Sequence, residues 1–258
     1  MIITCPKCHY QRQTIDTQVN AAICPACGIV YEKWLARQAG SQTSPENKIE
    51  ADIKEANSTE FDEVEKRESF REFISYVPEN IDPAVFWTRA ITLAGFALWG
   101  FCFISAGVNW EKIGGSFLHG ANLAFHEFGH IFFSPLGHFM MILGGSLFQI
   151  LLPFCLMGVF MIKQRDNFAA SIMLWWCGQN FIDVSPYIDD AQYRALPLVG
   201  GGGEESHDWG NLLTMMNVLE KTHKISHACF YIGCAIIIVA LAWGFYILRL
   251  QKKNLHKH

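Results

Sequence analysis

The chain has 258 residues, of which 51% are hydrophobic, and its mean hydropathy is +0.17. This composition is too apolar for a typical soluble domain, although roughly the first eighty residues are polar, so the average combines two unlike halves. The net charge of −4 gives no support for nucleic-acid binding, and we expect no nucleic acid among the partners.

Two CxxC pairs lie near the N-terminus, Cys5 with Cys8 and Cys24 with Cys27, and fifteen residues separate the pairs. This spacing is typical of a tetrahedral site in which four thiolates bind one structural Zn²⁺. Residues 1–35 therefore resemble a zinc ribbon, a small β module with too few apolar residues to fold without its metal. The expected strands are the short alternating segments at 10–16 and 29–31. Two disulfides or a redox pair are the alternatives, but two matched pairs at this spacing favour zinc.

Residues 36–80 are rich in Ser, Asn, Glu and Lys and are predicted to form a polar, flexible linker. Within this linker, aromatic residues recur at loosely helical spacing from Glu60 to Phe73, so an amphipathic helix beside the membrane is an alternative to a solvated tether. Reduced thiolates favour a cytosolic location for the ribbon. Its expected role is to bind a protein partner or to regulate the membrane domain.

Residues 81–258 are predicted to form a transmembrane domain, because they contain about five runs of nearly 20 apolar residues. The predicted spans are 86–108, 117–135, 146–163, 168–188 and 226–248. The expected fold is thus an all-α, multi-pass membrane protein with about five transmembrane helices and a small N-terminal β module, located in a bacterial inner membrane. The segment 137–146 either extends the third span or forms a short re-entrant strand pair. An odd number of spans places the basic C-terminal tail on the side opposite a cytosolic N-terminus, against the usual preference of basic residues for the cytosol. Either the tail is an exception or the span count is off by one.

The second predicted span contains the most informative motif, His126-Glu127-Phe128-Gly129-His130. Residues four apart share one face of an α-helix, so the imidazoles of His126 and His130 can bind one Zn²⁺. Glu127 lies beside the first ligand and can act as the general base toward a water held by the ion. Because ionisable groups are costly within a membrane, the motif predicts a catalytic metal site.

A catalytic zinc site needs a third protein ligand. The residue pattern offers Asp183 inside the fourth predicted span, Asp189 and Asp190 at its end, and His207 in the polar loop 189–225. This loop contains four consecutive glycines and could fold back to bring His207 to the ion. Asp183 could instead support a ligand histidine through a hydrogen bond. The pattern alone leaves these alternatives open.

The HExxH helix and the later run from Asn180 through Pro186 to Asp190 together resemble the site-2 protease family of intramembrane zinc metalloproteases. The resemblance covers about residues 115–192, although Asp-Asp-Ala stands where the family has Leu-Asp-Gly. It implies that Asp190 completes the catalytic zinc site with the two histidines, and that Asn180 holds the substrate backbone or orients the site. It also implies hydrolysis of peptide bonds in membrane-embedded substrates, with one catalytic and one structural Zn²⁺.

A non-enzymatic membrane zinc-binding protein, such as a transporter, sensor or scaffold, is the alternative from a different class. His and Asp in membrane helices also mark ion pathways. Such a pathway needs polar residues across the whole bilayer, whereas here they cluster at one depth apart from His119. We therefore expect the partners to be a membrane-protein substrate and the lipid bilayer.

Overall fold

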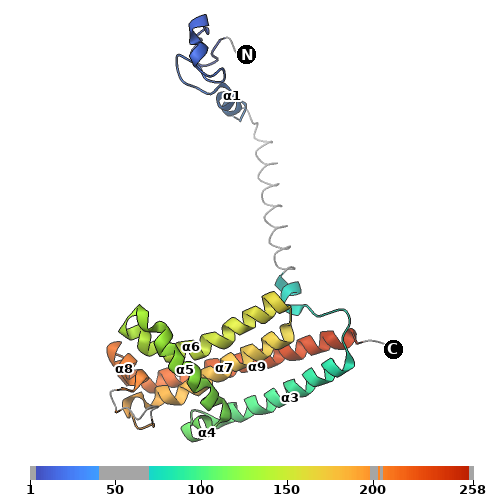
Figure 1. The fold of residues 1–258 in the computed structure, drawn as a ribbon, viewed down its shortest axis with the longest axis vertical. Coiled ribbons are helices and arrows are strands. Elements are labelled where there is room, and N and C mark those ends of the chain that lie inside the picture. The colour runs from blue at the N-terminus through green and yellow to red at the C-terminus, as the bar shows by residue number, and fades with distance from the viewer. Residues whose placement is uncertain (1–3, 41–69, 198–202, 204–205, 256–258) are drawn as a thin grey trace. The chain divides into compact units, whose positions relative to one another are not determined.

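The computed structural model describes residues 4–40, 70–197, 203 and 206–255 (Figure 1). The chain divides into two compact units, Met1–Ser69 and Phe70–His258. Most of the predicted linker, including nearly all of the helix expected from Glu60 to Phe73, lies outside the described residues.

The described residues are mostly helical. The N-terminal unit contains a short 3-10 helix, η1 (Thr14–Gln18), and α1 (Tyr31–Gly40). The second unit contains α3 (Pro83–Ala106), α4 (Trp110–Gly114), α5 (Phe117–Phe133), η2 (Ser134–Leu136), α6 (His138–Val159), η3 (Phe160–Gln164), α7 (Asn167–Asp189), η4 (Asp190–Gln192), α8 (Asp208–Met215), η7 (Leu219–Lys221) and α9 (Thr222–Lys253).

The N-terminal unit is built on two copies of the same cysteine turn. The amide of His9 donates to the carbonyl oxygen of Cys5, and the amide of Gly28 donates to that of Cys24, each at 2.9 Å. Both His9 and Gly28 have positive φ angles, +58° and +70°, because the chain must reverse directly after each CxxC pair. Each turn therefore presents its pair of thiols on a tightly folded backbone.

The β-strands expected in this unit are not confirmed. In the part of it that is described, strand pairing is limited to isolated bridges between Thr4 and Gln11 and between Ile23 and Val30. The 3-10 helix η1 occupies the end of the predicted strand 10–16, because the Asp16 carboxylate accepts a hydrogen bond from the Gln13 amide at 2.8 Å. The cysteine turns, not a sheet, give the unit its shape.

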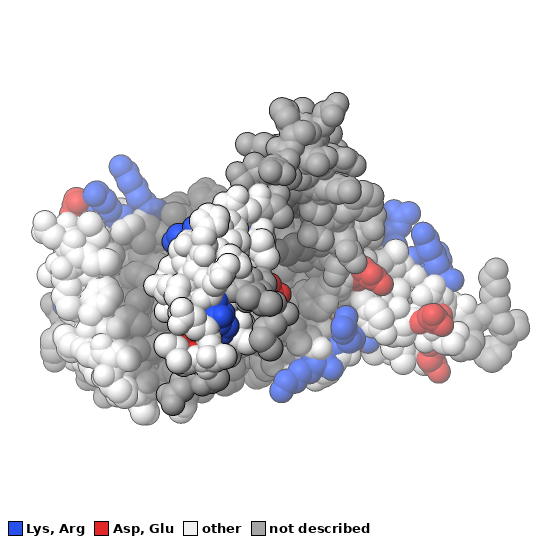
Figure 2. All heavy atoms as spheres, turned by 90° about the horizontal axis from the view of Figure 1, so that it is seen from above, with Lys and Arg blue, Asp and Glu red and all other residues white. Residues whose placement is uncertain are grey.

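Three helical segments of the described chain are long and apolar enough to cross a membrane: Pro83–Ala106, His138–Gln164 and Leu219–Lys253. Large apolar side chains on one face of α3 support a lipid environment, since Trp87, Ile91, Leu98 and Phe101 are all 63–72% exposed. Figure 2 likewise shows broad surfaces without Lys, Arg, Asp or Glu. These observations indicate a membrane protein.

The prediction of about five spans is not confirmed. Helices α5 and α7 coincide with the second and fourth predicted spans, but α5 has only 17 residues. Helix α7 buries polar side chains along its length, among them Gln179, Asn180 and Asp183, and so it lies inside the unit rather than against lipid. The segment 137–146 extends the third span as the first turns of α6, and the re-entrant alternative is not observed.

The beginning and the end of the second unit lie on the same side. Ile81, just before α3, forms a parallel bridge with Leu255, just after α9. Arg89 near the start of α3 forms a 2.6 Å ion pair with Asp166, the N-cap of α7. The first and last residues of the second unit therefore lie at one end of it, and α3, α6, α7 and α9 run between its two ends (Figure 1).

Glycine pairs set the closest helix contacts of this unit. A Cβ atom on Gly144 of α6 would lie 2.6 Å from the carbonyl oxygen of Gly129 in α5, and one on Gly233 of α9 would lie 2.6 Å from that of Gly178 in α7. Small residues allow helix backbones to approach closely in a membrane. The first pair holds α6 directly against the HExxH helix.

Candidate metal centres

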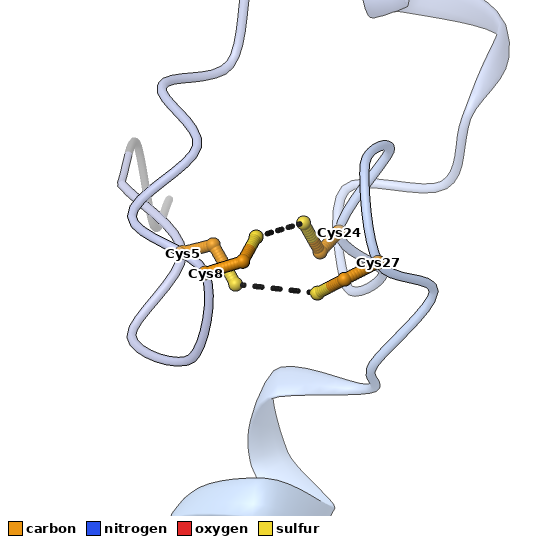
Figure 3. Close-up of side chains that lie close together, drawn as sticks. All are labelled: Cys5, Cys8, Cys24 and Cys27. Atoms are coloured by element: carbon orange, nitrogen blue, oxygen red, sulfur yellow. Dashed lines mark hydrogen bonds between the residues drawn. The ribbon is translucent and has the colours of Figure 1, made fainter.

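The four predicted cysteines of the N-terminal unit come together around one point (Figure 3). The Sγ atoms of Cys5 and Cys27 are 3.7 Å apart, as are those of Cys8 and Cys24. In a tetrahedral site with Zn–S bonds of about 2.3 Å, neighbouring sulfur atoms are about 3.8 Å apart. The cluster therefore has the donor set and the spacing of a tetrahedral metal site.

The thiols of this cluster differ in their readiness to ionise. Burial opposes ionisation of Cys24, but the backbone amides of Cys27 and Ala26 and the neighbouring thiols lower its pKa from 9.0 to about 6. A backbone hydrogen bond from Tyr10 lowers the pKa of Cys8, but the neighbouring thiols raise it to about 12 overall. The neighbouring thiols thus share a tendency to ionise, and a metal ion would displace their remaining protons on binding.

A second centre lies in the membrane unit, where α5 places His126 and His130 on one face. The Nε2 atoms of His126 and His130 lie 3.0 and 3.3 Å from Oδ2 of Asp208, the first residue of α8. Donor atoms bound about 2.0–2.1 Å from a tetrahedral ion are about 3.3–3.4 Å apart. Two imidazoles and one carboxylate therefore fit a metal site with three protein ligands and an open fourth position.

Hydrogen bonds fix the orientation of both imidazole rings. Nδ1 of His130 donates to the backbone oxygen of Met141, and Nδ1 of His126 donates to Oε1 of Gln149, both at 2.9 Å. A neutral imidazole with its proton on Nδ1 presents a lone pair on Nε2. The lone pairs on the two Nε2 atoms face the negative carboxylate of Asp208, so these three groups repel one another. A metal ion bound between them would remove this repulsion. Metal-binding histidines generally make this kind of supporting hydrogen bond.

At Gly145 of α6, the absence of a side chain leaves room for an ion beside the two histidines. A Cβ atom on Gly145 would lie 2.6 Å from Nε2 of His126 and 2.7 Å from Nε2 of His130. The next residue, Ser146, accepts a 3.0 Å hydrogen bond from Nε1 of Trp209 in α8. The consecutive residues Gly145 and Ser146 thus leave space at the ligand atoms and position the helix that carries Asp208.

Among the described residues, the carboxylate that lies beside the two histidines belongs to Asp208 and not to Asp190, the ligand that the family resemblance implied. Asp190 follows α7, and its Oδ2 accepts a 2.9 Å hydrogen bond from the Leu196 amide. The same oxygen lies 3.3 Å from Nε2 of His207, the other candidate. His207 is fully buried as the N-cap of α8, where its Nδ1 accepts from the Gly210 amide at 3.0 Å. Asp190 and His207 therefore position the start of α8 instead of pointing at the two histidines.

Asp208 is not among the ligands that the sequence predicts, although its neighbour His207 is. In the His207-Asp208-Trp209 triplet, each residue makes a different contact: with Asp190, with the two histidines, and with Ser146. The Asp208 amide also donates to Oη of Tyr187 at 3.0 Å. The sequence contains one sign of this ligand, namely a carboxylate directly after a candidate histidine in the loop.

The other sequence candidates lie away from this centre. Asp189 pairs with Nδ1 of His223 at 2.7 Å on the exposed side. Asn180 is fully buried, donates to the Trp176 carbonyl oxygen within α7 at 3.0 Å, and is not among the residues that line the cavity beside the histidines. Asn180 therefore lies apart from the cavity beside the histidines.

Asp183 belongs to a buried polar network between α5 and α7. Its Oδ1 lies 3.2 Å from Nδ1 of His119, and its Oδ2 accepts from Nδ2 of Asn122 at 3.2 Å. Asn122 also donates to Gln179 and accepts from Trp176, each at 2.9 Å. These bonds satisfy polar groups that would be costly to bury alone and fix α5 against α7.

A cavity of about 340 Å³ joins the histidine centre to this network. Its walls include His126, His130, Asp208, Glu127, His119 and Asp183. Glu127 is exposed toward this space, one residue from the first histidine. The cavity thus contains three side chains that could hold a metal ion, the carboxylate of Glu127, and space for a further molecule.

Comparisons with protein-family models, with curated proteins and with solved structures gave no match. The geometry of the two centres is therefore the basis for any statement about function.

Proposed function

We propose that this chain is a membrane-embedded zinc hydrolase that cleaves peptide bonds of membrane-protein substrates. The observation that carries the proposal is the placement of Glu127 in the same cavity as His126, His130 and Asp208. Two imidazoles and a carboxylate suit zinc, and hydrolytic zinc sites combine three protein ligands with a nearby carboxylate. The resemblance of the HExxH region to site-2 proteases agrees with this function, with Asp208 in the place proposed for Asp190.

Each residue of the centre has a defined task in this proposal. A bound Zn²⁺ supplies a Lewis acid that polarises a carbonyl and lowers the pKa of a water molecule. Glu127 accepts the proton of the attacking water and passes it to the leaving amine. Gln149 and the Met141 carbonyl keep the imidazole protons on Nδ1, so that both Nε2 atoms stay available as ligands.

The state of the substrate backbone matters for this chemistry. The carbonyl and amide groups of an intact α-helix are hydrogen-bonded to one another and covered by side chains, so a peptide bond within it is shielded from an attacking water. We therefore propose that a transmembrane substrate unwinds locally and presents an extended segment to Glu127.

The proposal is tested with full-length protein and fluorescein-labelled single-span peptides in proteoliposomes. We expect the zinc-loaded protein to cleave at least one peptide of the panel, because the centre has both a metal and a base. The Glu127→Gln variant should keep its zinc and lose cleavage. Peptide cleavage that is equally fast in Glu127→Gln would contradict the proposal, as would a zinc-loaded protein that cleaves none of the panel.

A metal transporter is the second candidate, because the His119–Asp183 pair adds ionisable groups at another depth of the same cavity. Ion pathways through membranes use such groups in series. Zinc uptake into vesicles that survives Glu127→Gln and fails in His126→Ala would favour transport. Uptake that is absent from both, together with cleavage by the unaltered protein, would favour the hydrolase.

The N-terminal cysteine cluster is proposed to hold a structural Zn²⁺ in the cytosol, on the cytosolic side of a bacterial inner membrane. Its expected function is to bind a protein partner or regulate the membrane unit. A pull-down with residues 1–40 in the presence and absence of zinc, compared with the Cys24→Ser variant, tests this role. Equal protein binding by both forms would contradict it.

A further inference from the structure

A second cavity of the membrane unit lies between α3 and α9 and is independent of the metal centres. Its volume is about 920 Å³, and most of its lining is apolar. The lining residues recur at helical spacing on both helices: Phe86, Ala90, Leu93, Ala94 and Ala97 on α3, and Leu241, Phe245 and Leu248 on α9. We call this space the α3–α9 groove. The alanines of α3 have little side-chain volume, which leaves the groove open.

The length of the groove matches one leaflet of a bilayer. From Phe86 to Ala97 the α3 wall is about 16 Å long, by the rise of about 1.5 Å per residue. Half of a hydrocarbon core of about 30 Å is about 15 Å. The groove is therefore about as long as the acyl-chain region of one leaflet, and its apolar lining suits the acyl chain of a lipid.

One end of the groove is basic. Arg249, Lys252 and Lys253 line it at the C-terminal end of α9, and all three side chains are exposed. Their spacing of three and four residues places them on one face of the helix. Among the residues that the structure describes, no ion pair involves any of them, whereas Arg89 nearby on α3 is bound to Asp166.

The basic end coincides with the level at which the membrane surface is expected. Both walls end there: α3 begins at Pro83, after its N-cap Asp82, and α9 ends at Lys253. Trp87 is exposed at this end, and Nε1 of Trp243 donates to the Ile74 carbonyl oxygen at 2.9 Å. Tryptophans of this kind gather at membrane–water interfaces. The three basic groups are thus at headgroup depth.

We propose that the α3–α9 groove binds one anionic phospholipid from the leaflet on the side where both ends of the unit lie. An acyl chain occupies the apolar groove, and the phosphate contacts Arg249, Lys252 and Lys253. Basic groups near the headgroups attract anionic lipids, and the groove adds apolar contact that a basic surface alone lacks. A zwitterionic lipid gains less, because its cationic headgroup faces the same three cations.

The test is native mass spectrometry of the full-length protein in detergent, titrated with phosphatidylglycerol, phosphatidylcholine or inorganic phosphate. The charge variant carries Arg249→Gln, Lys252→Gln and Lys253→Gln. Ala94→Phe fills the groove without changing a charge. Lys163→Gln is the matched control, because Lys163 is an exposed basic residue of η3 outside the groove. Circular dichroism checks that every variant keeps its helix content.

We expect the unaltered protein to retain one phosphatidylglycerol and to bind phosphatidylcholine at least tenfold more weakly. Each removed charge should weaken phosphatidylglycerol binding by about fivefold. Ala94→Phe should abolish retention, and Lys163→Gln should leave it unchanged. Equal binding of the two lipids, retention by the charge variant or by Ala94→Phe, an equal loss in Lys163→Gln, or displacement of the lipid by inorganic phosphate would each overturn the proposal.

Discussion

The Gly145→Ala substitution tests the geometry of the histidine centre with the addition of one methyl group. The new Cβ atom would lie 2.6 Å from Nε2 of His126 and 2.7 Å from Nε2 of His130, whereas ordinary van der Waals contact begins near 3.4 Å. Either the imidazoles or α6 must therefore move by about 0.7–0.8 Å. Metal sites tolerate changes of only about 0.2 Å in ligand distance.

We expect Gly145→Ala to weaken metal binding by about 10- to 100-fold, the range seen when the support of a ligand is disturbed. Gly158→Ala in the same helix is the matched control, because its Cβ atom would meet nothing within 4 Å. That change should leave metal affinity unaltered and should favour the helix by about 0.5–1 kcal/mol.

The assay is chelator competition on purified full-length protein, with metal content measured by mass spectrometry. Both variants are made in a Cys24→Ser, Cys27→Ser background, so that the N-terminal cluster does not contribute. Circular dichroism confirms equal helix content. Metal affinity in Gly145→Ala equal to that of Gly158→Ala would refute the placement of a metal ion between the two Nε2 atoms.

Three further predictions concern the surroundings of the two centres. Gln149→Leu removes the acceptor for Nδ1 of His126 and should lower metal affinity about 10- to 100-fold in the same chelator assay, and an unchanged affinity would contradict this role. Asp208→Asn should lower metal affinity more than about 100-fold, because Asp208 is the proposed ligand, and Asp190→Asn should lower it only about tenfold, because Asp190 positions α8. A larger loss in Asp190→Asn than in Asp208→Asn would favour Asp190, the ligand predicted from the sequence. A chelator should unfold residues 4–40, and the assay is the loss of amide dispersion in NMR spectra of an isolated 1–40 peptide. A spectrum that stays dispersed would show that the module folds without metal.

Local sequence patterns predicted the parts of the two centres that depend on nearby residues. Two CxxC pairs and an HExxH helix bring their side chains together through turns and helical repeats that the sequence contains directly. The structure accordingly places Cys5, Cys8, Cys24 and Cys27 around one point, and His126 and His130 on one face of α5.

The third ligand depends on a long-range contact, which local patterns do not contain. Asp208 is 78 residues beyond His130, and its position follows from α8 packing against α6. The hydrogen bond between Asp208 and Tyr187 spans 21 residues, and the Asp190–His207 contact joins the end of α7 to the start of α8 across the same loop. The resemblance of the run from Asn180 to Asp190 favoured Asp190, whereas the fold of the loop brings Asp208 to the histidines.

The span count differed because hydropathy does not separate a lipid-facing helix from a central one. Helix α7 is apolar enough on average to have been predicted as a span, yet it buries Gln179, Asn180 and Asp183 against its neighbours. Contacts at Ile81–Leu255 and Arg89–Asp166, which no local pattern contains, show that both ends of the unit share one side.

The most direct test of the histidine centre is X-ray absorption spectroscopy of the Cys24→Ser, Cys27→Ser protein loaded with one equivalent of zinc. We predict two imidazole nitrogen and at least one oxygen neighbour at about 2.0–2.2 Å, with no sulfur. Asp208→Asn should change the oxygen shell, and Asp190→Asn should leave it as it was. A sulfur neighbour, a shell without imidazole, or a spectrum that changes with Asp190 and not with Asp208 would contradict the site described here.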